Sequence, residues 1–313
     1  MGELPNSQST FRIGTRGSPL ALAQAREVMD RMQAACGLPE DAFEIIVIKT
    51  TGDTIQDRPL KDIGGKGLFT REIEESLMAS GIDIAVHSMK DMPVEQPAGL
   101  TLDCYLPRED VRDAFISPAG GTLADLAPGS KVGTSSLRRK AQVLNRRPDL
   151  EVIEFRGNVQ TRLRKLDEGV AQCTFLAMAG LNRLGLSHIA TSPLDTDNML
   201  PAIAQGAIGV ERRADDNRTE EMLAAIHDIE TGQRLAAERA FLAALDGSCE
   251  TPIAGLAELN GNVLTLRGEI LRTDGSEALS DSRTGPVGDG AVMGRDLAND
   301  LLSLAGDGFF DWK

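Results

Sequence analysis

Basic residues gather in one segment of a chain that is otherwise acidic. The 313 residues carry a formal net charge of −14, yet residues 131–165 hold ten basic and three acidic side chains, a local net charge of +7. The planar guanidinium of arginine pairs in a bidentate manner with a carboxylate or a phosphate, so this segment is suited to anion binding. The alternative is a solvated basic surface without a ligand.

The arginines of this segment stand in turns of small residues that lead into helical patterns. Arg138 and Arg139 come after Gly-Thr-Ser-Ser at 133–136. Arg156, and Arg16 near the N-terminus, are each followed by glycine and a small polar residue. Free backbone N–H groups and the helix dipole favour anions at such turns, and open α/β sheets bind ligands where their strands end. We therefore expect anion donors from two α/β domains to converge on one cleft.

A second group of reactive side chains follows an apolar run at 82–86. In the sequence His-Ser-Met-Lys-Asp-Met-Pro at 87–93, the Asp91 carboxylate can transfer protons or stabilise a cation, and the Lys90 ammonium can bind anions. A solvent-exposed ion pair is the alternative. The three histidines, including His87, are scattered and are expected to be ordinary structural residues, so neither a metal site nor a catalytic triad is indicated.

Of the four cysteines, Cys249 differs from the others in its surroundings. It stands in Asp-Gly-Ser-Cys-Glu-Thr-Pro at 246–252, a loop sequence, whereas the other three lie in or beside apolar runs where inert, buried thiols are expected. The chain has no Cys-x-x-Cys pair, so neither a zinc site nor a disulfide framework is indicated. Cys249 is therefore the candidate for a functional thiol.

The loop Gly-Gly-Lys-Gly at 64–67 looks like a phosphate-binding loop but does not match one. A Walker loop requires glycine at position 60 and serine or threonine at position 67, where this chain has Leu60 and Gly67. A glycine-hinged lid that carries the cation of Lys66 is one interpretation, and an ordinary surface loop is the other.

The elements that must position these residues alternate between strand and helix patterns. Strands are expected at 11–15, 43–48, 82–86, near 132, 152–155 and 174–178. Helices are expected at 68–78, 137–145 and 159–166, and from 19 onward, where Ser18 and Pro19 predict an N-cap and a first-turn proline. This alternation predicts βαβ units and a largely parallel sheet in each of two α/β domains. A helix at 231–245, strands at 253–259 and 263–270 around Asn260-Gly261, and a helix at 292–304 predict a small α+β C-terminal domain.

Composition argues against several other classes of protein. An aromatic fraction of 4%, with one Trp and one Tyr, and the negative net charge argue against nucleic-acid binding. Residues 1–10 lack the features of an export signal, and no apolar run approaches the roughly 18 residues of a membrane span. We therefore expect a cytoplasmic protein without nucleic-acid or membrane partners.

Eight segments of the chain together resemble the porphobilinogen deaminase family, also called the hydroxymethylbilane synthases. They occur in the family's order between residue 12 and about residue 255, whereas residues 256–313 contribute little to the resemblance. The matching segments are IGTRGSPLALAQ at 13–24, GGKGLFTREIE at 64–74, DIAVHSMKDMP at 83–93, KVGTSSLRRKAQ at 131–142, FRGNVQTRLRKL at 155–166, LAMAGLNRLG at 176–185, LPAIAQGAIGVE at 200–211 and GSCETPI at 247–253.

The resemblance implies a transferase of tetrapyrrole biosynthesis, the route to heme and chlorophyll. Such an enzyme condenses four porphobilinogen molecules head to tail into linear hydroxymethylbilane and releases ammonia at each addition. It is primed by a dipyrromethane cofactor, one per chain, held through a thioether. By motif match, Cys249 is the attachment point, and Asp91 and Lys90 are the catalytic pair, which also contacts the cofactor.

The resemblance also assigns binding positions and implies no metal. Thr134, Ser136, Arg138 and Arg139 match cofactor contacts, Arg16, Ser18, Arg156, Arg162 and Arg183 match substrate contacts, and Lys66 and Phe69 match lid positions. The chain departs from many relatives at Asp62, where they have a basic residue before the glycine loop. No lid role is therefore carried over to position 62.

The fold implied is two α/β domains like those of periplasmic binding proteins around a cleft, followed by a small α+β domain. Domain 1 comprises 1–106 with 207–225, domain 2 comprises 107–206, and domain 3 comprises 226–313 and carries the cofactor cysteine. A monomer with porphobilinogen as its small-molecule substrate is implied. The alternative, a noncatalytic anion receptor of the periplasmic type, would need neither Cys249 nor Asp91. A LysR-type effector domain is disfavoured because no helix-turn-helix precedes the first α/β unit.

Overall fold

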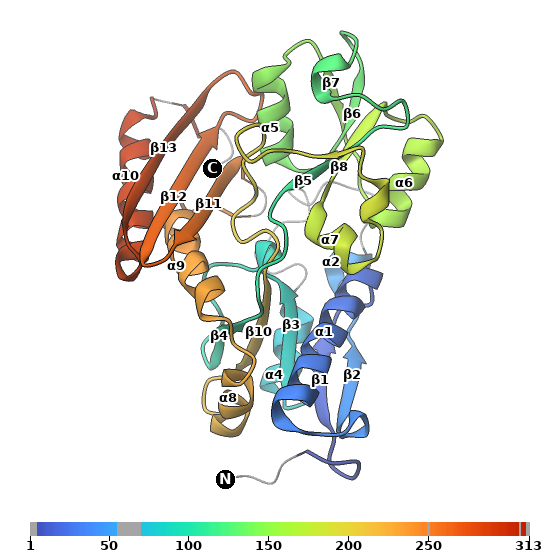
Figure 1. The fold of residues 1–313 in the computed structure, drawn as a ribbon, viewed down its shortest axis with the longest axis vertical. Coiled ribbons are helices and arrows are strands. Elements are labelled where there is room, and N and C mark those ends of the chain that lie inside the picture. Colours follow the sequence, from blue (N-terminus) through green and yellow to red (C-terminus); the bar gives the residue numbers. More distant parts are fainter. Residues whose placement is uncertain (1–4, 55–69, 249–250, 307, 311–313) are drawn as a thin grey trace. The chain divides into compact units, whose positions relative to one another are not determined.

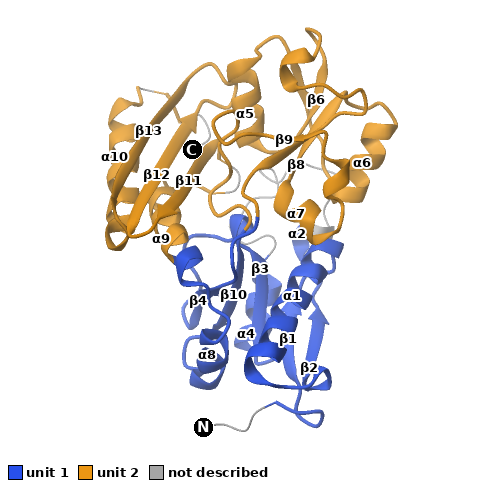
Figure 2. Cartoon of the chain, viewed as in Figure 1, with its two compact units in different colours: residues 1–109, 207–232 blue, residues 110–206, 233–313 orange. Residues whose placement is uncertain are grey.

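The computed structural model describes residues 5–54, 70–248, 251–306 and 308–310, drawn in colour in Figure 1. Contacts within the chain divide it into two compact units, residues 1–109 with 207–232 and residues 110–206 with 233–313 (Figure 2). The chain therefore passes from one unit to the other after residues 109, 206 and 232. Among the helices of the described residues, none combines the length and the apolar character that crossing a membrane requires.

Unit 1 is built on a five-stranded mixed sheet in the order β2-β1-β3-β10-β4. In this sheet β1 (Phe11–Thr15), β2 (Phe43–Val47) and β3 (Ile84–Ser88) run parallel, whereas β10 (Ile208–Arg213) is antiparallel to β3 and to β4 (Leu100–Tyr105). The carboxyl ends of β1 and β3 therefore lie at the same edge of the sheet.

Helices cover both faces of this sheet. α1 (Pro19–Cys36) lies on one face and begins where Ser18 Oγ accepts a hydrogen bond from Ala21 N, the cap that the sequence predicted. α4 (Arg71–Met78) lies on the other face, because successive side chains of β3 alternate between the apolar clusters of the two helices. The remaining elements of unit 1 are η1 (Glu40–Ala42), α2 (Thr51–Thr54), η2 (Met89–Asp91) and α8 (Asn217–Ala224).

The first sheet of unit 2 has the order β7-β6-β8-β5-β9. Here β6 (Lys131–Gly133), β7 (Glu151–Ile153) and β8 (Cys173–Ala177) run parallel, and β5 (Asp113–Ile116) is antiparallel to β8 and to β9 (Ser192–Pro193). α5 (Leu137–Arg146) packs with one apolar cluster, and α6 (Val159–Asp167) and α7 (Met178–Arg183) pack with another. The short elements are η3 (Leu123–Asp125) and η4 (Ser187–Ile189).

The C-terminal part of unit 2 is an antiparallel sheet with two helices (Figure 1). Its elements are α9 (Ile229–Ala244), which belongs to unit 2 from residue 233 onward, β11 (Ile253–Asn260), β12 (Val263–Leu271), β13 (Ala278–Pro286), η5 (Val287–Asp289) and α10 (Gly290–Leu304). The turn between β11 and β12 contains Gly261 with a φ of 59°, as the Asn-Gly pair predicted for a hairpin. Together the three sheets confirm the predicted α/β class with a small α+β C-terminal part.

Each five-stranded sheet contains one reversed strand, which the sequence analysis did not predict. The reversed strands are β10 in unit 1 and β5 in unit 2. Each is the first strand after the chain enters its unit, β5 after residue 109 and β10 after residue 206. A strand that arrives from another unit is not joined to its neighbour by a βαβ crossover, so the parallel direction imposed by that crossover does not apply. The prediction of a largely parallel sheet holds for the other strands.

Candidate functional site

A pocket in unit 1 lies at the carboxyl ends of β1 and β3. Its polar lining includes Arg16 and Ser18 from the turn after β1, and Ser88 and Asp91 from the end of β3 and the turn that follows. Gln24 of α1 also lines it, and its buried amide Nε2 donates a hydrogen bond to Ser88 Oγ at 2.9 Å. The structure thus brings three predicted site residues into one pocket of a single unit.

The wall of this pocket holds a buried contact between an imidazole and a carboxylate that the sequence analysis missed. His87 lines the pocket, and its Nε2 lies 3.1 Å from Oε2 of Glu211 on β10. The two side chains are 5% and 0% exposed, respectively. His87 is buried, as an ordinary structural histidine would be, but its position gives it a share in the pocket. A single acid in the apolar run Ile-Gly-Val-Glu at 208–211 is the sequence signal that could have indicated a buried carboxylate here.

Lys90 and Asp91 stand on η2, the short helical turn after β3. Both side chains are half-buried. Met89 and Met92, on either side of them, are buried, so the turn is held by its apolar residues while its charged residues keep access to solvent. This arrangement leaves the Asp91 carboxylate available to a ligand in the pocket.

In unit 2, Arg138 and Arg139 hold a carboxylate of the protein itself. Their side chains are 4% and 6% exposed, and each donates from Nη2 to a different oxygen of Asp113, at 2.8 and 2.7 Å. Their Nη1 atoms donate to the carbonyls of Leu200 and Phe175. The terminal nitrogens of both arginines are therefore engaged in holding unit 2 together, and the expectation that they bind the cofactor stays a prediction.

Asp113 is the first residue of β5, and the sequence analysis assigned it no role. Its side chain is fully buried and also accepts a hydrogen bond from Gln205 Nε2 at 2.9 Å. Burial alone would raise the pKa of Asp113, but the charges and hydrogen bonds of Arg138 and Arg139 lower it well below its usual range. The carboxylate is thus held ionised between two guanidinium groups, which is the arrangement a buried charge requires.

Thr134 and Ser136, the predicted polar cofactor contacts, shape the turn between β6 and α5. Thr134 Oγ1 accepts a hydrogen bond from Ser136 N at 3.2 Å, and Ser136 Oγ caps α5 by accepting from Arg139 N at 3.4 Å. In this structure both hydroxyls are part of the strand-to-helix turn, the location predicted for anion binding. That they contact the cofactor stays a prediction.

Arg156, Arg162 and Arg183 differ from Arg138 in being only partly buried. Arg156 lies in the turn between β7 and α6, and Arg162, in the first half of α6, donates from Nε to the carbonyl of Gly157 in that turn at 2.8 Å. Arg183 lies in the last turn of α7, where its two Nη atoms donate to the carbonyl of Gly206. These three arginines keep more of their surface exposed to solvent than the pair at Asp113.

The predicted cofactor cysteine, Cys249, lies outside the described residues, as do Lys66, Phe69 and Asp62. The residues that flank Cys249 are tied together: the Thr251 hydroxyl accepts from Ser248 N at 3.0 Å and donates to Ser248 O at 2.7 Å.

The three described cysteines fit the prediction of unreactive thiols. Burial raises the pKa of Cys104 and of Cys173 to about 12, and it also raises the pKa of the partly exposed Cys36. Since the thiolate is the nucleophile, none of the three is suited to covalent attachment near neutral pH.

The chain is similar to known proteins along its whole length. The porphobilinogen deaminase of Paracoccus denitrificans is 65% identical over 313 residues and is covered completely, as is this chain. The porphobilinogen deaminase of Nitrobacter winogradskyi is 56% identical over 298 residues, which are 95% of this chain and 94% of the relative. The chloroplastic porphobilinogen deaminase of Pisum sativum is 54% identical over 313 residues, covering 98% of this chain and 85% of the relative.

Solved structures share the fold only loosely. The VFT2 domain of Bordetella pertussis BvgS matches with a TM-score of 0.42 and 16% identity, covering 74% of this chain and 91% of that one. An arginine-specific periplasmic binding protein of Salmonella typhimurium matches with a TM-score of 0.39 and 15% identity, covering 72% of this chain and 96% of that one. Likenesses at this level carry no argument about function.

Two family descriptions match this chain. "Porphobilinogen deaminase, dipyromethane cofactor binding domain" matches residues 11–221, and "Porphobilinogen deaminase, C-terminal domain" matches residues 233–303. The first match includes the pocket residues Arg16 and Asp91, and the second covers the C-terminal sheet and its helices. With both matches and a relative that is 65% identical from end to end, the chain belongs to the porphobilinogen deaminase family.

Proposed function

We propose that this chain is a hydroxymethylbilane synthase whose chemistry takes place at Asp91. It joins four porphobilinogen molecules head to tail into linear hydroxymethylbilane, a tetrapyrrole precursor, and releases ammonia at each addition. The observation that carries the assignment of the site is the pocket in unit 1, where Asp91 and Arg16 meet at the ends of two parallel strands. A carboxylate and an anion-binding side chain in one pocket match a substrate that bears carboxylates and reacts through a cation.

Asp91 can serve both halves of each addition. Loss of ammonia from the aminomethyl group of porphobilinogen breaks a C–N bond and leaves a cation that a nearby carboxylate stabilises. A pyrrole carbon of the growing chain then forms the new C–C bond and gives up its proton, which a carboxylate can accept. One residue that remains in place can therefore act in all four cycles.

The partly exposed arginines suit the carboxylates of the substrate. Each pyrrole ring carries an acetate and a propionate, so two cofactor rings and four added rings present about twelve carboxylates to pair with arginine forks. Arg16 in unit 1, and Arg156, Arg162 and Arg183 in unit 2, are proposed to bind them. This requirement accounts for a cluster of basic residues in a chain whose net charge is −14.

Cys249 is proposed to hold the dipyrromethane through a thioether. Three features support this: the flanking residues Ser248 and Thr251 are tied into a turn, the three described cysteines have raised pKa values, and Cys249 stands between glycine and proline in sequence. The cofactor supplies the terminal pyrrole carbon to which the first porphobilinogen is joined. A thioether is not cleaved by thiol exchange, so the growing chain stays attached between additions.

Intact-mass measurement with peptide mapping tests this proposal. The active enzyme should exceed the mass of its polypeptide by one dipyrromethane, located on Cys249, and a Cys249→Ser variant should lack it. Fully active enzyme with an unmodified Cys249 would overturn the attachment.

We likewise propose a division into three domains, namely 1–106 with 207–225, 107–206, and 226–313. It is supported by the sheets, since each of the three sheets falls within one of these domains. Contacts within the chain group the second and third domains into one unit. Limited proteolysis near residue 226 tests whether the third is a separate domain. A monomeric state and a cytoplasmic location stay predictions, and light scattering on the purified enzyme tests the first.

A further inference from the structure

The reversed strand β10 runs beside the turn that carries Lys90 and Asp91. β10 pairs with the end of β3, with Ile208 opposite Ser88 and Gly209 opposite His87. The pairing continues one residue beyond the strand, because Met89 N donates to the carbonyl of Ala207 at 3.0 Å. The backbone of β10 therefore fixes where β3 ends and where the η2 turn begins.

Met89, the first residue of η2, packs directly on the bare backbone of Gly209. Met89 is 1% exposed, and a Cβ added to Gly209 would lie 2.1 Å from its Sδ. No real Cβ contact is that short, so any larger residue at 209 displaces the side chain of Met89. A glycine inside a strand often marks such a close approach. Since Met89 lies two residues before Asp91, the contact of its side chain with Gly209 lies next to the turn that carries Asp91.

Glu211, two residues further along β10, holds His87 on the same face of the sheet. Its Oε2 lies 3.1 Å from His87 Nε2, and its buried Oε1 has no hydrogen-bond partner among the described residues. Glu74 of α4 is buried nearby. Burial, and to a smaller extent the charge of Glu211, raises the pKa of Glu74. Two carboxyl groups and one imidazole inside an apolar unit are costly for stability, so this cluster calls for a functional reason.

We propose that Gly209 and Glu211 are positioning residues for Asp91. Gly209 sets the position of Met89, and Glu211 sets that of His87, which lines the same pocket as Asp91. Together they hold His87 and Met89, the residues on either side of Ser88, and thereby the part of the pocket wall that carries Asp91. This inference rests on the proposed function. The proposal predicts that changes at Gly209 and Glu211 lower kcat and leave KM nearly unchanged. The arginines proposed to bind the substrate carboxylates are not part of the contacts that these two residues make.

Steady-state kinetics on holoenzyme variants test the proposal. Gly209→Ala and Glu211→Gln should each lower kcat about tenfold or more while KM changes less than about twofold. Met89→Ala combined with Gly209→Ala removes the sulfur that the new methyl group would meet, and should recover part of the lost kcat. A double variant as slow as Gly209→Ala alone would overturn the role of Gly209, and normal kcat in Glu211→Gln would overturn that of Glu211.

A matched control separates positioning from general damage to the fold. Gly268 on β12 is similarly crowded, since a Cβ there would lie 2.6 Å from the Phe241 ring. Gly268→Ala should lower the melting temperature as Gly209→Ala does, yet leave kcat unchanged. Equal losses of kcat in both variants would show that only stability is involved and would refute the proposal.

Two further measurements complete the test. The chain has three histidines, so imidazole nitrogen spectra of ¹⁵N-labelled enzyme should show one signal, that of His87, displaced in Glu211→Gln. Three unchanged signals would contradict a pairing of His87 with Glu211. Asp91→Asn is measured in parallel: full activity in that variant would remove the proposed catalytic site, whereas an inactive Asp91→Asn beside a normal Glu211→Gln would remove the present inference alone.

Discussion

Both reversed strands carry a fully buried acid, but the two acids have different surroundings. In unit 2, Asp113 on β5 is matched by two arginines and a glutamine amide, so both of its oxygens are paired. In unit 1, Glu211 on β10 has one imidazole partner and one oxygen without a hydrogen bond among the described residues. A fully compensated buried charge is a structural element, whereas an under-compensated one beside a pocket is a candidate for function. The two reversed strands thus hold buried acids that differ in how fully they are paired.

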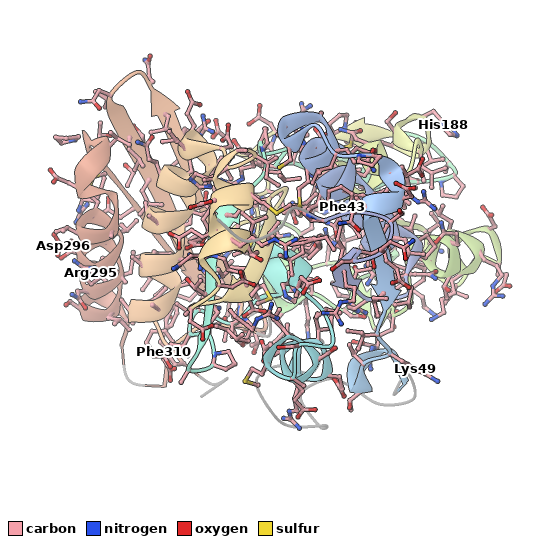
Figure 3. All side chains as sticks on the ribbon, turned by 90° about the horizontal axis from the view of Figure 1, so that it is seen from below. Phe43, Lys49, His188, Arg295, Asp296 and Phe310 are labelled. Carbon is pink, nitrogen blue, oxygen red and sulfur yellow. The ribbon has the colours of Figure 1, made fainter. Side chains whose placement is uncertain are left out.

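The largest expected effect concerns the pocket of unit 1. Asp91→Asn should reduce turnover by at least about 100-fold, because the variant cannot stabilise the cation or accept a proton. Its melting temperature should stay close to that of the wild type. Asp296, an exposed residue of α10 (Figure 3), provides the control, and Asp296→Asn should retain full turnover. Near-normal turnover of Asp91→Asn would remove Asp91 from its role.

The next effect concerns the buried acid of unit 2. Asp113→Asn removes the carboxylate that accepts from both buried guanidinium groups, so the free energy of unfolding should fall by about 3–5 kcal/mol, measured by urea denaturation. Asp149→Asn, which removes the partner of Arg147 at the surface, should have a much smaller effect. If both variants lost the same stability, the contrast between a structural and an under-compensated acid would not hold.

The same carboxylate predicts a response to acid. The pKa of Asp113 is lowered in the folded state, so its contribution to stability is present above its unfolded pKa of about 3.9 and is lost as the pH falls through the folded value. The difference in unfolding free energy between wild type and Asp113→Asn should therefore be constant between about pH 5 and 7 and shrink below about pH 4. A difference that grew in acid would contradict the assigned sign.

The smallest expected effect separates the two kinds of arginine. Arg156→Gln should raise KM for porphobilinogen about tenfold, the loss of about 1.4 kcal/mol expected for one charge-assisted hydrogen bond. It should change stability far less than Arg138→Gln, which leaves Asp113 under-paired. Michaelis–Menten kinetics and thermal melts of the two variants check this. A large loss of stability in Arg156→Gln with unchanged KM would place Arg156 with the structural pair.

Local sequence signals were sufficient for many of the elements, although the strands β4, β5, β10 and β13 were not predicted. The Ser18 cap, the small-residue turn before Arg138 and the Asn260-Gly261 hairpin each act over a few residues, and each prediction is confirmed. The reversed direction of β10 was not predictable in the same way. Its buried Glu211 contacts a partner 124 residues away, and no local pattern records such a distance.

The sequence by itself determined two things. Arginines and a Lys-Asp pair stand where strands end, and their motifs identify the family. The sequence could not tell which arginines hold an acid of the protein itself, because Arg138 and Arg156 occupy similar strand-to-helix turns. Only the tertiary structure decided this, by bringing Asp113, 25 residues before Arg138 in the chain, into contact with its guanidinium. A buried charge is satisfied by whatever the fold places beside it, and that neighbour is set by packing between distant segments.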